Sequence, residues 1–362
     1  QDTAVMDTEE TGEDPVVADT EETGEDPVVA GTEETESQPD RDTEETESQP
    51  EPEADTKILI TGDVLFGNMF RVNYDRSGIT GVVDGTLLAR MQEADLVLIN
   101  NEFPFSDRGT PMEEKEFTFR CSPSYAAALD EMGVDIASLA NNHTLDYGRE
   151  ALSDTFAALD EAGIRYAGAG ESVERAEEVQ IIEVNGKRFG FLAVTRVVPV
   201  VSWKVEHQTP GLFSCYDDTR LVELVEEAKA DCDVLVVYAH WGVEYEAYPE
   251  EYQTGIARRC LAAGADVVAG CHTHCLQGVE WMDGKPVFYS LGNFIFGKEI
   301  DSSAVLQITV SAEGAVRYQL LPVCARNGVT ALADDERAAQ ILRYLDSISP
   351  GASVGEDGTV TE

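Results

Sequence analysis

Four of the five histidines in this chain stand at the ends of short apolar runs, beside other residues that bind metal ions or move protons in proteins. Runs such as Ile58–Ile60 and Val234–Tyr238 are typical of buried strands. An α/β protein builds a site where several strand ends deliver polar side chains to one edge of a sheet. A single buried histidine is usually an ordinary core residue, whereas four at strand ends favour a functional cluster. The residues that follow such runs are Asp63, Asn142, His143, His240, His272 and His274.

The side chains at these strand ends suit a divalent metal ion. Carboxylate and amide oxygens are hard ligands, and imidazoles extend the choice to Mn, Zn, Fe or Mg without selecting among them. His272 and His274 alternate, so an extended backbone projects both rings to the same side. Glu102, which follows two asparagines, is expected either to ligate the metal or to act as a base. We predict a divalent metal site formed by Asp63, Glu102, Asn142, His240, His272 and His274.

A second group of residues is expected to act on a substrate. We expect His143 to protonate a leaving group or to hold a phosphoryl oxygen, and Asp146 to orient the His143 ring. Anion contacts are expected from the segment that holds Lys115 and Arg120, and a wall of the site from Trp241. Asn293 follows a further strand and completes the candidate substrate contacts.

Ordinary structural roles are the alternatives for several of these residues. Asp63 by itself also fits a turn or a helix cap, and Glu102 also fits a solvated loop. The segment that holds Lys115 and Arg120 fits a plain strand with one solvated face. Cys271, next to His272, is either a soft ligand or a small core residue, and the second role is favoured.

The composition excludes several classes of partner. The 362 residues include 70 acidic and 25 basic ones, for a formal net charge of −45. Such a surface lacks the Lys/Arg excess that nucleic acids and anionic lipids require, and it suits divalent cations. The sequence also lacks the GxSxG, P-loop and GxGxxG motifs, so it gives no support to a serine hydrolase, an NTPase or a dinucleotide-binding protein.

The first 55 residues form a degenerate acidic repeat. The run DTEETGEDPVVA occupies residues 7–18 and again 19–30, and TEETESQP occupies 32–39 and 43–50. Too few apolar residues are present to offset the entropy of ordering, so residues 1–55 are predicted to be disordered and extended by like charges. Because the chain begins at Gln1, we expect a removed signal peptide or membrane anchor before it, or a trimmed end. The repeat is then a spacer that holds the domain away from a membrane or through a cell wall; a solvated tail without a specific role is the alternative.

Deleting residues 1–55 is expected to leave the melting temperature unchanged, because their composition cannot form a core. Thermal unfolding of the full chain and of the shortened chain checks this. A fall of several degrees, or slow amide exchange within the repeat, would contradict it.

The remainder of the chain alternates strands with helices and then adds antiparallel pairs. This order indicates a layered α/β sandwich with a mixed sheet, spanning residues 56–330. Residues 331–362 are expected to form a last helix at 334–347 and a polar tail that packs on, or trails, the same domain. No run of 18 apolar residues is present, so a membrane contact is expected only through the missing anchor. The clearest other predictions are strands at 57–61, 96–99, 134–139, 267–269 and 286–291, helices at 85–93, 124–132, 149–162, 218–230 and 250–263, and a hairpin of 179–184 with 188–195.

Seven motifs between Lys57 and Phe296 carry a resemblance to a known family. In order they read GD, NNEFPF, FTFR, SLANNHTLDYG, AHWGVEY, GCHTHCLQGVE and YSLGNFIF. This series is similar to the poly-γ-glutamate capsule biosynthesis family of the CapA type, which belongs to the calcineurin-like metallophosphoesterase superfamily. The resemblance implies an α/β fold of four layers, an α/β/β/α sandwich. It also implies a bacterial cell-surface protein that works with the capsule synthesis machinery on poly-γ-glutamate or another cell-surface substrate.

The resemblance also implies roles for individual residues, with two departures. Asp63, the pair Asn142 and His143, His240, and the pair His272 and His274 match the superfamily's metal and catalytic positions. The histidine usually found two residues after the first aspartate is replaced by Leu65, which weakens one of two metal positions, so the resemblance implies one or two bound ions. The usual bridging aspartate is replaced by Glu102, whose longer side chain can preserve a bridge. Three functions fit this pattern: a metal-dependent hydrolase or transferase of capsule synthesis, a phosphoesterase unrelated to capsule, and a binding protein that has lost the chemistry.

Overall fold

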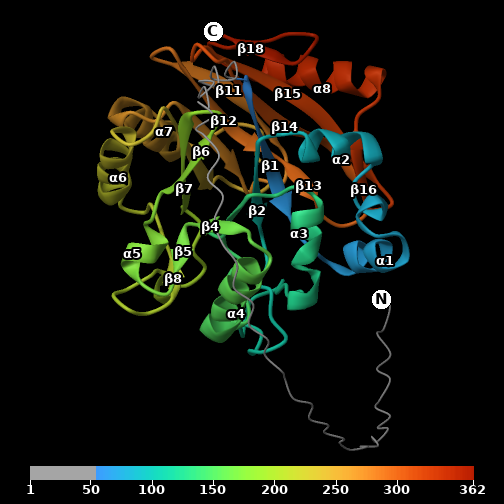
Figure 1. Ribbon diagram of the computed structural model, residues 1–362, viewed down its shortest axis with the longest axis vertical. Coiled ribbons are helices and arrows are strands. Elements are labelled where there is room, and N and C mark those ends of the chain that lie inside the picture. Colours follow the sequence, from blue (N-terminus) through green and yellow to red (C-terminus); the bar gives the residue numbers. More distant parts are fainter. Residues whose placement is uncertain (1–53) are drawn as a thin grey trace, which may run out of the picture. The chain divides into compact units, whose positions relative to one another are not determined.

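The protein is described by a computed structural model over residues 54–362. The predicted spacer at residues 1–55 lies almost entirely outside the described residues. Within residues 54–362, two large sheets lie face to face between layers of helices (Figure 1).

The larger sheet has a parallel half and an antiparallel half. β1 (Thr56–Val64) pairs in parallel with β2, and the parallel run continues through β3 to β4. On its other edge β1 pairs antiparallel with β14, and β14 with β15. The remaining members are β2 (Leu96–Asn101), β3 (Ile136–Ser138), β4 (Arg165–Ala167), β13 (Asn293–Ile295), β14 (Ile300–Val310), β15 (Val316–Arg326), β16 (Val329–Leu332), β17 (Ser353–Val354) and β18 (Thr359–Thr361).

The smaller sheet has the order β11-β12-β10-β9-β7-β6. Its central strands β7, β9, β10 and β12 are parallel, and antiparallel strands close both edges. The hairpin predicted at Asn185-Gly186 is present: both residues have positive φ, as a tight two-residue hairpin turn requires. The members are β6 (Gln180–Val184), β7 (Lys187–Thr195), β9 (Val234–His240), β10 (Val267–Cys271), β11 (Leu276–Met282) and β12 (Lys285–Leu291); β5 (Ala169–Gly170) and β8 (Gly211–Leu212) form a separate pair.

Strand residues alternate between two cores, as the period of a strand requires. In β1, Ile58 and Ile60 face the core between the two sheets, whereas Leu59 faces the helices on the outer side of the larger sheet. In β9, Val236 faces the core between the sheets and Val237 faces the helices on the opposite side of the molecule. The order of layers is therefore α/β/β/α, which confirms the predicted four-layer sandwich.

Helices cover both outer faces of the paired sheets (Figure 1). The outer face of the larger sheet packs against α1 (Asn68–Ser77), α2 (Gly85–Gln92), α3 (Ala127–Glu131) and α4 (Gly148–Glu161). The outer face of the smaller sheet packs against α6 (Thr219–Lys229) and α7 (Glu251–Ala263). Two further helices are α5 (Val173–Ala176) and α8 (Asp335–Ser347), and α8 buries Ile341, Leu342 and Leu345 in the core between the sheets. Short 3-10 turns lie at Ile79–Gly81, Pro123–Tyr125 and Val201–Trp203.

The sequence prediction differs from the structure at two helices. The single helix expected over 124–132 is divided into a 3-10 turn and the five-residue α3. α1 was not predicted, because it buries only Phe70 and Asn73 and so shows no apolar stripe. The polar tail after α8 contributes β17 and β18, which extend the larger sheet through β15.

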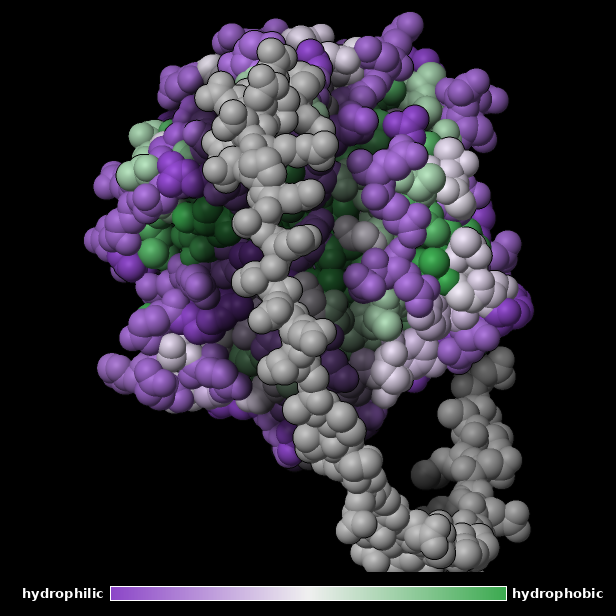
Figure 2. Space-filling view, viewed as in Figure 1, coloured by the Kyte–Doolittle hydropathy of each residue, from purple (hydrophilic) through white to green (hydrophobic). Residues whose placement is uncertain are grey.

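The visible face of the folded part is mostly hydrophilic, with apolar side chains showing only in patches (Figure 2). Among residues 54–362, no helix has both the length and the apolar composition needed to cross a membrane.

Candidate functional site

The carboxyl ends of the parallel strands in both sheets meet at one edge of the sandwich and supply the candidate site. β1 delivers Asp63, and Glu102 comes directly after β2. The loop after β3 carries Asn142 and His143. From the smaller sheet, β9 ends at His240 and β10 ends at Cys271, just before His272 and His274.

The first group of candidate ligands contains Glu102, His240 and His272. One ligand atom of each lies within 4.8 Å of the others, and all three side chains are buried. Asn142 joins them, because its Oδ1 lies 2.8 Å from His240 Nε2. This set combines a carboxylate, an amide oxygen and two imidazoles, which is a suitable donor set for a divalent transition metal.

The second group contains Asp63, Glu102 and His274, again within 4.8 Å of one another. Glu102 belongs to both groups, so both would share this carboxylate if each held an ion. The residue two positions after Asp63 is Leu65, an almost fully buried side chain that offers no ligand atom. The second group therefore has one protein donor fewer than the first, which also has the Asn142 amide.

A local irregularity in β1 brings Asp63 to this position. The register of β1 against β2 shifts between Ile60 and Asp63, as in a β-bulge. Gly62 lies in the shift, and a Cβ built on it would lie 1.7 Å from the carbonyl oxygen of Gly292. The backbone N–H of Asp63 donates to that same oxygen at 3.0 Å. Close contact between two backbone segments therefore fixes the Asp63 carboxylate.

Glu102 is the candidate ligand whose surroundings satisfy it least. Its side chain is completely buried, and neither carboxylate oxygen has a hydrogen-bond partner. Burial and the charge of Asp63 raise the pKa of Glu102 well above its usual value. A buried carboxylate without donors is costly unless it binds metal or takes up a proton. The donor set around it fits a divalent ion, and His272 Nδ1 is also buried and unpartnered.

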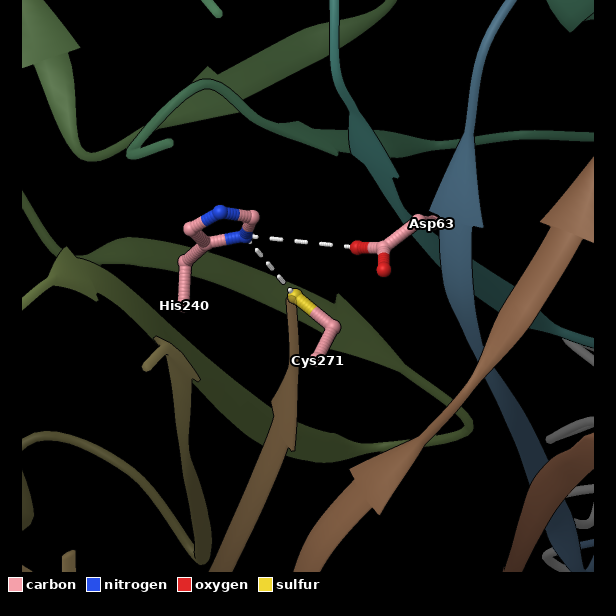
Figure 3. Close-up of side chains that lie close together, drawn as sticks. All are labelled: Asp63, His240 and Cys271. Carbon is pink, nitrogen blue, oxygen red and sulfur yellow. Dashed lines mark hydrogen bonds and ion pairs between the residues drawn. The ribbon is translucent and has the colours of Figure 1, made fainter. Parts of the chain in front are cut away.

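A third group brings a thiol close to the same histidine. In Figure 3, Asp63 and Cys271 both lie beside His240, whose Nδ1 is 3.3 Å from the Cys271 sulfur and 4.0 Å from Asp63 Oδ1. Burial raises the pKa of the Cys271 thiol well above its usual value. Cys271 also packs in the core between the sheets. It therefore supports the ring of His240 as a neutral side chain, which matches the core role favoured from the sequence.

The three histidines of the cluster differ in their protonation. Burial lowers the pKa of His240 well below its usual value and that of His272 to about 4. Burial acts the same way on His274, but the hydrogen bond and charge of Asp63 outweigh it and raise the pKa to about 10. In return, the pKa of Asp63 is lowered although its side chain is buried. Neutral imidazoles at His240 and His272 are ready to bind a metal, whereas a metal at His274 must displace a proton.

His143 belongs to a separate hydrogen-bonded group at the rim of the cluster. His143 Nδ1 and Asp146 Oδ2 are 2.7 Å apart, so the carboxylate can hold the ring as expected from the sequence. Lys115 Nζ donates to the carbonyl oxygen of Asn142 at 2.5 Å and to Asp146 Oδ1, and it lies 3.0 Å from His143 Nδ1. Burial lowers the pKa of both His143 and Lys115. The Lys115 ammonium therefore contacts Asn142, His143 and Asp146 of the protein itself.

The paired histidines are not held by an extended backbone, as the alternation in the sequence suggested. β10 ends at Cys271, and both His272 and His274 have positive φ, which is uncommon outside glycine. The segment turns so that the backbone N–H of His272 donates to Asp63 at 3.1 Å. As a result His272 faces the first ligand group and His274 the second.

Trp241 is not a wall of the site. Its side chain is fully buried in the core between the smaller sheet and helices α6 and α7, and its Nε1 donates to the carbonyl oxygen of Tyr289. Successive residues of a strand point to opposite faces, so His240 in the site requires Trp241 on the other side.

Asn293 lies at the cluster, where its Oδ1 is 2.9 Å from His274 Nδ1. Arg120 lies on the exposed surface and stacks on Tyr147.

Asn100 is a site residue that the sequence prediction omitted. It is fully buried, and its Nδ2 donates to Asp63 Oδ1 at 2.8 Å and lies 3.3 Å from His240 Nδ1. Asn141 in turn donates to Asn100 Oδ1 at 3.1 Å. The signal was present in the sequence, because Asn100 stands two residues before Glu102 at the end of β2.

Comparisons with known proteins identify the family of this chain. A family described as "Bacterial capsule synthesis protein PGA_cap" matches residues 57–298. The chain is 28% identical over 307 residues to "PGA biosynthesis protein CapA" of Bacillus subtilis (strain 168), covering 83% of this chain and 80% of that protein. It is 29% identical over 296 residues to "Capsule biosynthesis protein CapA" of Bacillus anthracis, covering 78% and 72%. The matched region contains every candidate site residue from Asp63 to Asn293, and the chain belongs to the bacterial capsule synthesis protein family PGA_cap.

Proposed function

We propose that this protein acts outside the cytoplasm in the synthesis or anchoring of poly-γ-glutamate, through a divalent-metal site with hydrolase-like chemistry. The observation that carries the proposal is the buried, unpartnered carboxylate of Glu102, shared between two groups of candidate ligands. The capsule role is supported by the family and by two relatives whose names state capsule or PGA biosynthesis.

Glu102, Asn142, His240 and His272 would hold one ion, and Asp63, Glu102 and His274 a second. A divalent ion bound there supplies Lewis acidity, which activates water and polarises a carbonyl or phosphoryl oxygen.

The protein's own residues supply proton transfer and orientation. The Asp146 carboxylate fixes His143 through Nδ1–H, which leaves Nε2 as the ring nitrogen for proton transfer. Nε2 would first take up a proton from water and then give that proton to the leaving group. Asn100 holds the Asp63 carboxylate in place, and Asn293 holds the ring of His274. Phe119, whose ring centre lies 4.4 Å from that of His143, shields the ring from water on one side.

The proposal is tested by metal analysis followed by a polymer assay. The full chain is purified without chelator from medium supplemented with Mn²⁺, Zn²⁺ or Fe²⁺, its metal content is measured, and the loaded protein is incubated with poly-γ-glutamate. We expect stoichiometric metal and a change in polymer length or end groups. Absence of stoichiometric metal in all three preparations would overturn the metal site. An unchanged polymer, together with a normal capsule after deletion of the gene, would overturn the capsule role.

Alanine variants of the histidines separate ligands from proton donors. His240→Ala, His272→Ala and His274→Ala are each expected to reduce bound metal, because each removes a donor from one of the two groups. His143→Ala is expected to keep its metal and to lose roughly 10²- to 10⁴-fold in turnover, the usual worth of a general acid. Metal content and initial rates are measured on the same samples. Loss of metal from His143→Ala, or unchanged metal in all three of the others, would contradict these roles.

A binding protein without catalysis is the second candidate, and Leu65 favours it. A buried leucine stands where the superfamily pattern has a ligand, so the second group has only three protein donors. If metal-loaded protein binds poly-γ-glutamate and leaves the polymer unaltered, the result would support the binding function over catalysis.

A further inference from the structure

A cavity of about 470 Å³ shares two wall residues with the surroundings of the metal cluster. Leu65, two residues after Asp63, forms part of its floor. Phe119 forms part of its wall and also contacts the ring of His143. Phe296 lies between this wall and the second ligand group, with its ring centre 6.3 Å from that of Phe119 and 4.7 Å from that of His274.

The cavity is positively charged, although the protein as a whole is strongly acidic. Two arginines, Arg71 and Arg120, line it, and its described lining contains no Asp or Glu. Neither guanidinium forms an ion pair with a carboxylate among residues 54–362. Two unpaired guanidiniums in one concave site are unusual in a chain of net charge −45.

Existing contacts hold both arginines toward this space. Arg120 stacks on the Tyr147 ring, with 4.3 Å between the guanidinium carbon and the ring centre, and donates to the carbonyl oxygen of Arg108 at 3.0 Å. Arg71 donates to the side chain of Asn68. Each guanidinium carries five N–H donors, so both keep donors for a ligand after these contacts. Because these contacts orient both guanidiniums before a ligand binds, the two side chains lose less conformational entropy on binding.

The start of α1 adds donors at the same place. Gly67, Asn68 and Met69 line the cavity, and α1 has neither a side-chain N-cap nor an acidic residue in its first turn. The first N–H groups of a helix lack partners within the helix and favour an anion. Two guanidiniums and this helix start therefore converge on one cavity.

We infer that this cavity is a carboxylate-binding subsite that holds the polymer substrate beside the metal cluster. The inference rests on the proposed function, in which the substrate is poly-γ-glutamate. A γ-linked glutamate chain has a free α-carboxylate on every residue, and guanidinium groups bind carboxylates through paired hydrogen bonds. A local positive cavity also explains how a protein of this charge holds a polyanion, because it offsets the general repulsion.

The test is a binding measurement that needs no turnover. The full chain, freed of unbound metal, is titrated with a short γ-linked glutamate oligomer, with the same oligomer after amidation of its α-carboxylates, and with inorganic phosphate. The variant is the double substitution Arg71→Gln and Arg120→Gln. The control is Arg90→Gln with Arg343→Gln, which removes two exposed arginines elsewhere and changes the net charge equally.

We expect the control to bind the oligomer as the wild type does and the variant to bind it about 100-fold more weakly, near tenfold for each lost guanidinium. The amidated oligomer is expected to bind wild type as weakly as the intact oligomer binds the variant. Thermal unfolding and metal content confirm that the variant is folded.

Equal loss in the variant and the control, or a wild type that binds the amidated oligomer equally well, would overturn the inference. So would an arginine-dependent site for phosphate with no affinity for the oligomer. These outcomes are distinct from failure of the proposed function. If the protein has neither metal nor turnover but still binds the oligomer through Arg71 and Arg120, the proposed function fails and the subsite stands. If the enzyme is active but binds the oligomer equally well after both substitutions, the subsite fails and the proposed function stands.

Discussion

Glu102→Gln is expected to abolish most of the stabilisation that the proposed metal ions would give this protein. At a free metal concentration about 1,000 times the Kd, binding adds about 4 kcal/mol to the free energy of unfolding, or roughly 8 °C in melting temperature for a domain of this size. Glu102 contributes to both ligand groups, so its loss weakens both. Melting curves with added Mn²⁺ or Zn²⁺ and with chelator measure the difference.

The same substitution is expected to change the metal-free protein little. Burial raises the pKa of Glu102 well above its usual value, which favours the protonated carboxyl without metal, and glutamine resembles that form in shape and charge. Glu280→Gln is the matched control, because this partly buried carboxylate binds the Tyr289 hydroxyl away from the cluster. A full metal response in Glu102→Gln, or a lost response in Glu280→Gln, would show that Glu102 does not hold the metal.

Gly62→Ala is expected to destabilise the fold by at least about 3 kcal/mol, the upper range for overpacking. The new Cβ would lie 1.7 Å from the carbonyl oxygen of Gly292, a backbone atom that no rotamer change can move. The two segments must separate, which also displaces Asp63 from its hydrogen bond to Gly292. Chemical denaturation measures the loss of stability, and metal analysis of the folded fraction measures the loss of the second ligand group.

Gly85→Ala is the matched control for this substitution. A Cβ on Gly85 meets no atom within 4 Å, and the residue opens α2. Alanine in a helix is favoured over glycine, so this variant is expected to be as stable as the wild type or up to about 1 kcal/mol more stable. A Gly62→Ala protein with the stability and metal content of Gly85→Ala would contradict the close contact at Gly292.

The convergence of the site was predictable because it follows from strand direction. Parallel strands share a carboxyl edge, so residues that end apolar runs must meet there. That logic places Asp63, Glu102, His240 and His272 without knowledge of any contact. It also placed His143 with Asp146, which are close in sequence. The layered α/β sandwich followed from the alternation of strands and helices, whereas its four layers followed only from the family resemblance.

Some features of the site could not be predicted from the sequence, because they depend on local backbone conformation and on which face of the strand a residue occupies. Trp241 follows His240 directly, and only the known direction of the His240 side chain assigns Trp241 to the opposite core. The positive φ values of His272 and His274 have no signal in a pair of alternating histidines. The cavity with Arg71 depends on α1, whose sequence lacks the apolar periodicity that predicts a helix.

The candidate ligands come from both sheets, and this division determines the stage of folding at which the proposed metal ions could bind. Asp63 and Glu102 belong to the larger sheet, whereas His240, His272 and His274 follow strands of the smaller sheet. Neither ligand group is complete until residues 272–274 have been synthesised and β10 has joined β9. Uptake of the proposed ion would therefore follow the pairing of both halves of the sandwich, and a bound ion would report that the two halves have closed on each other.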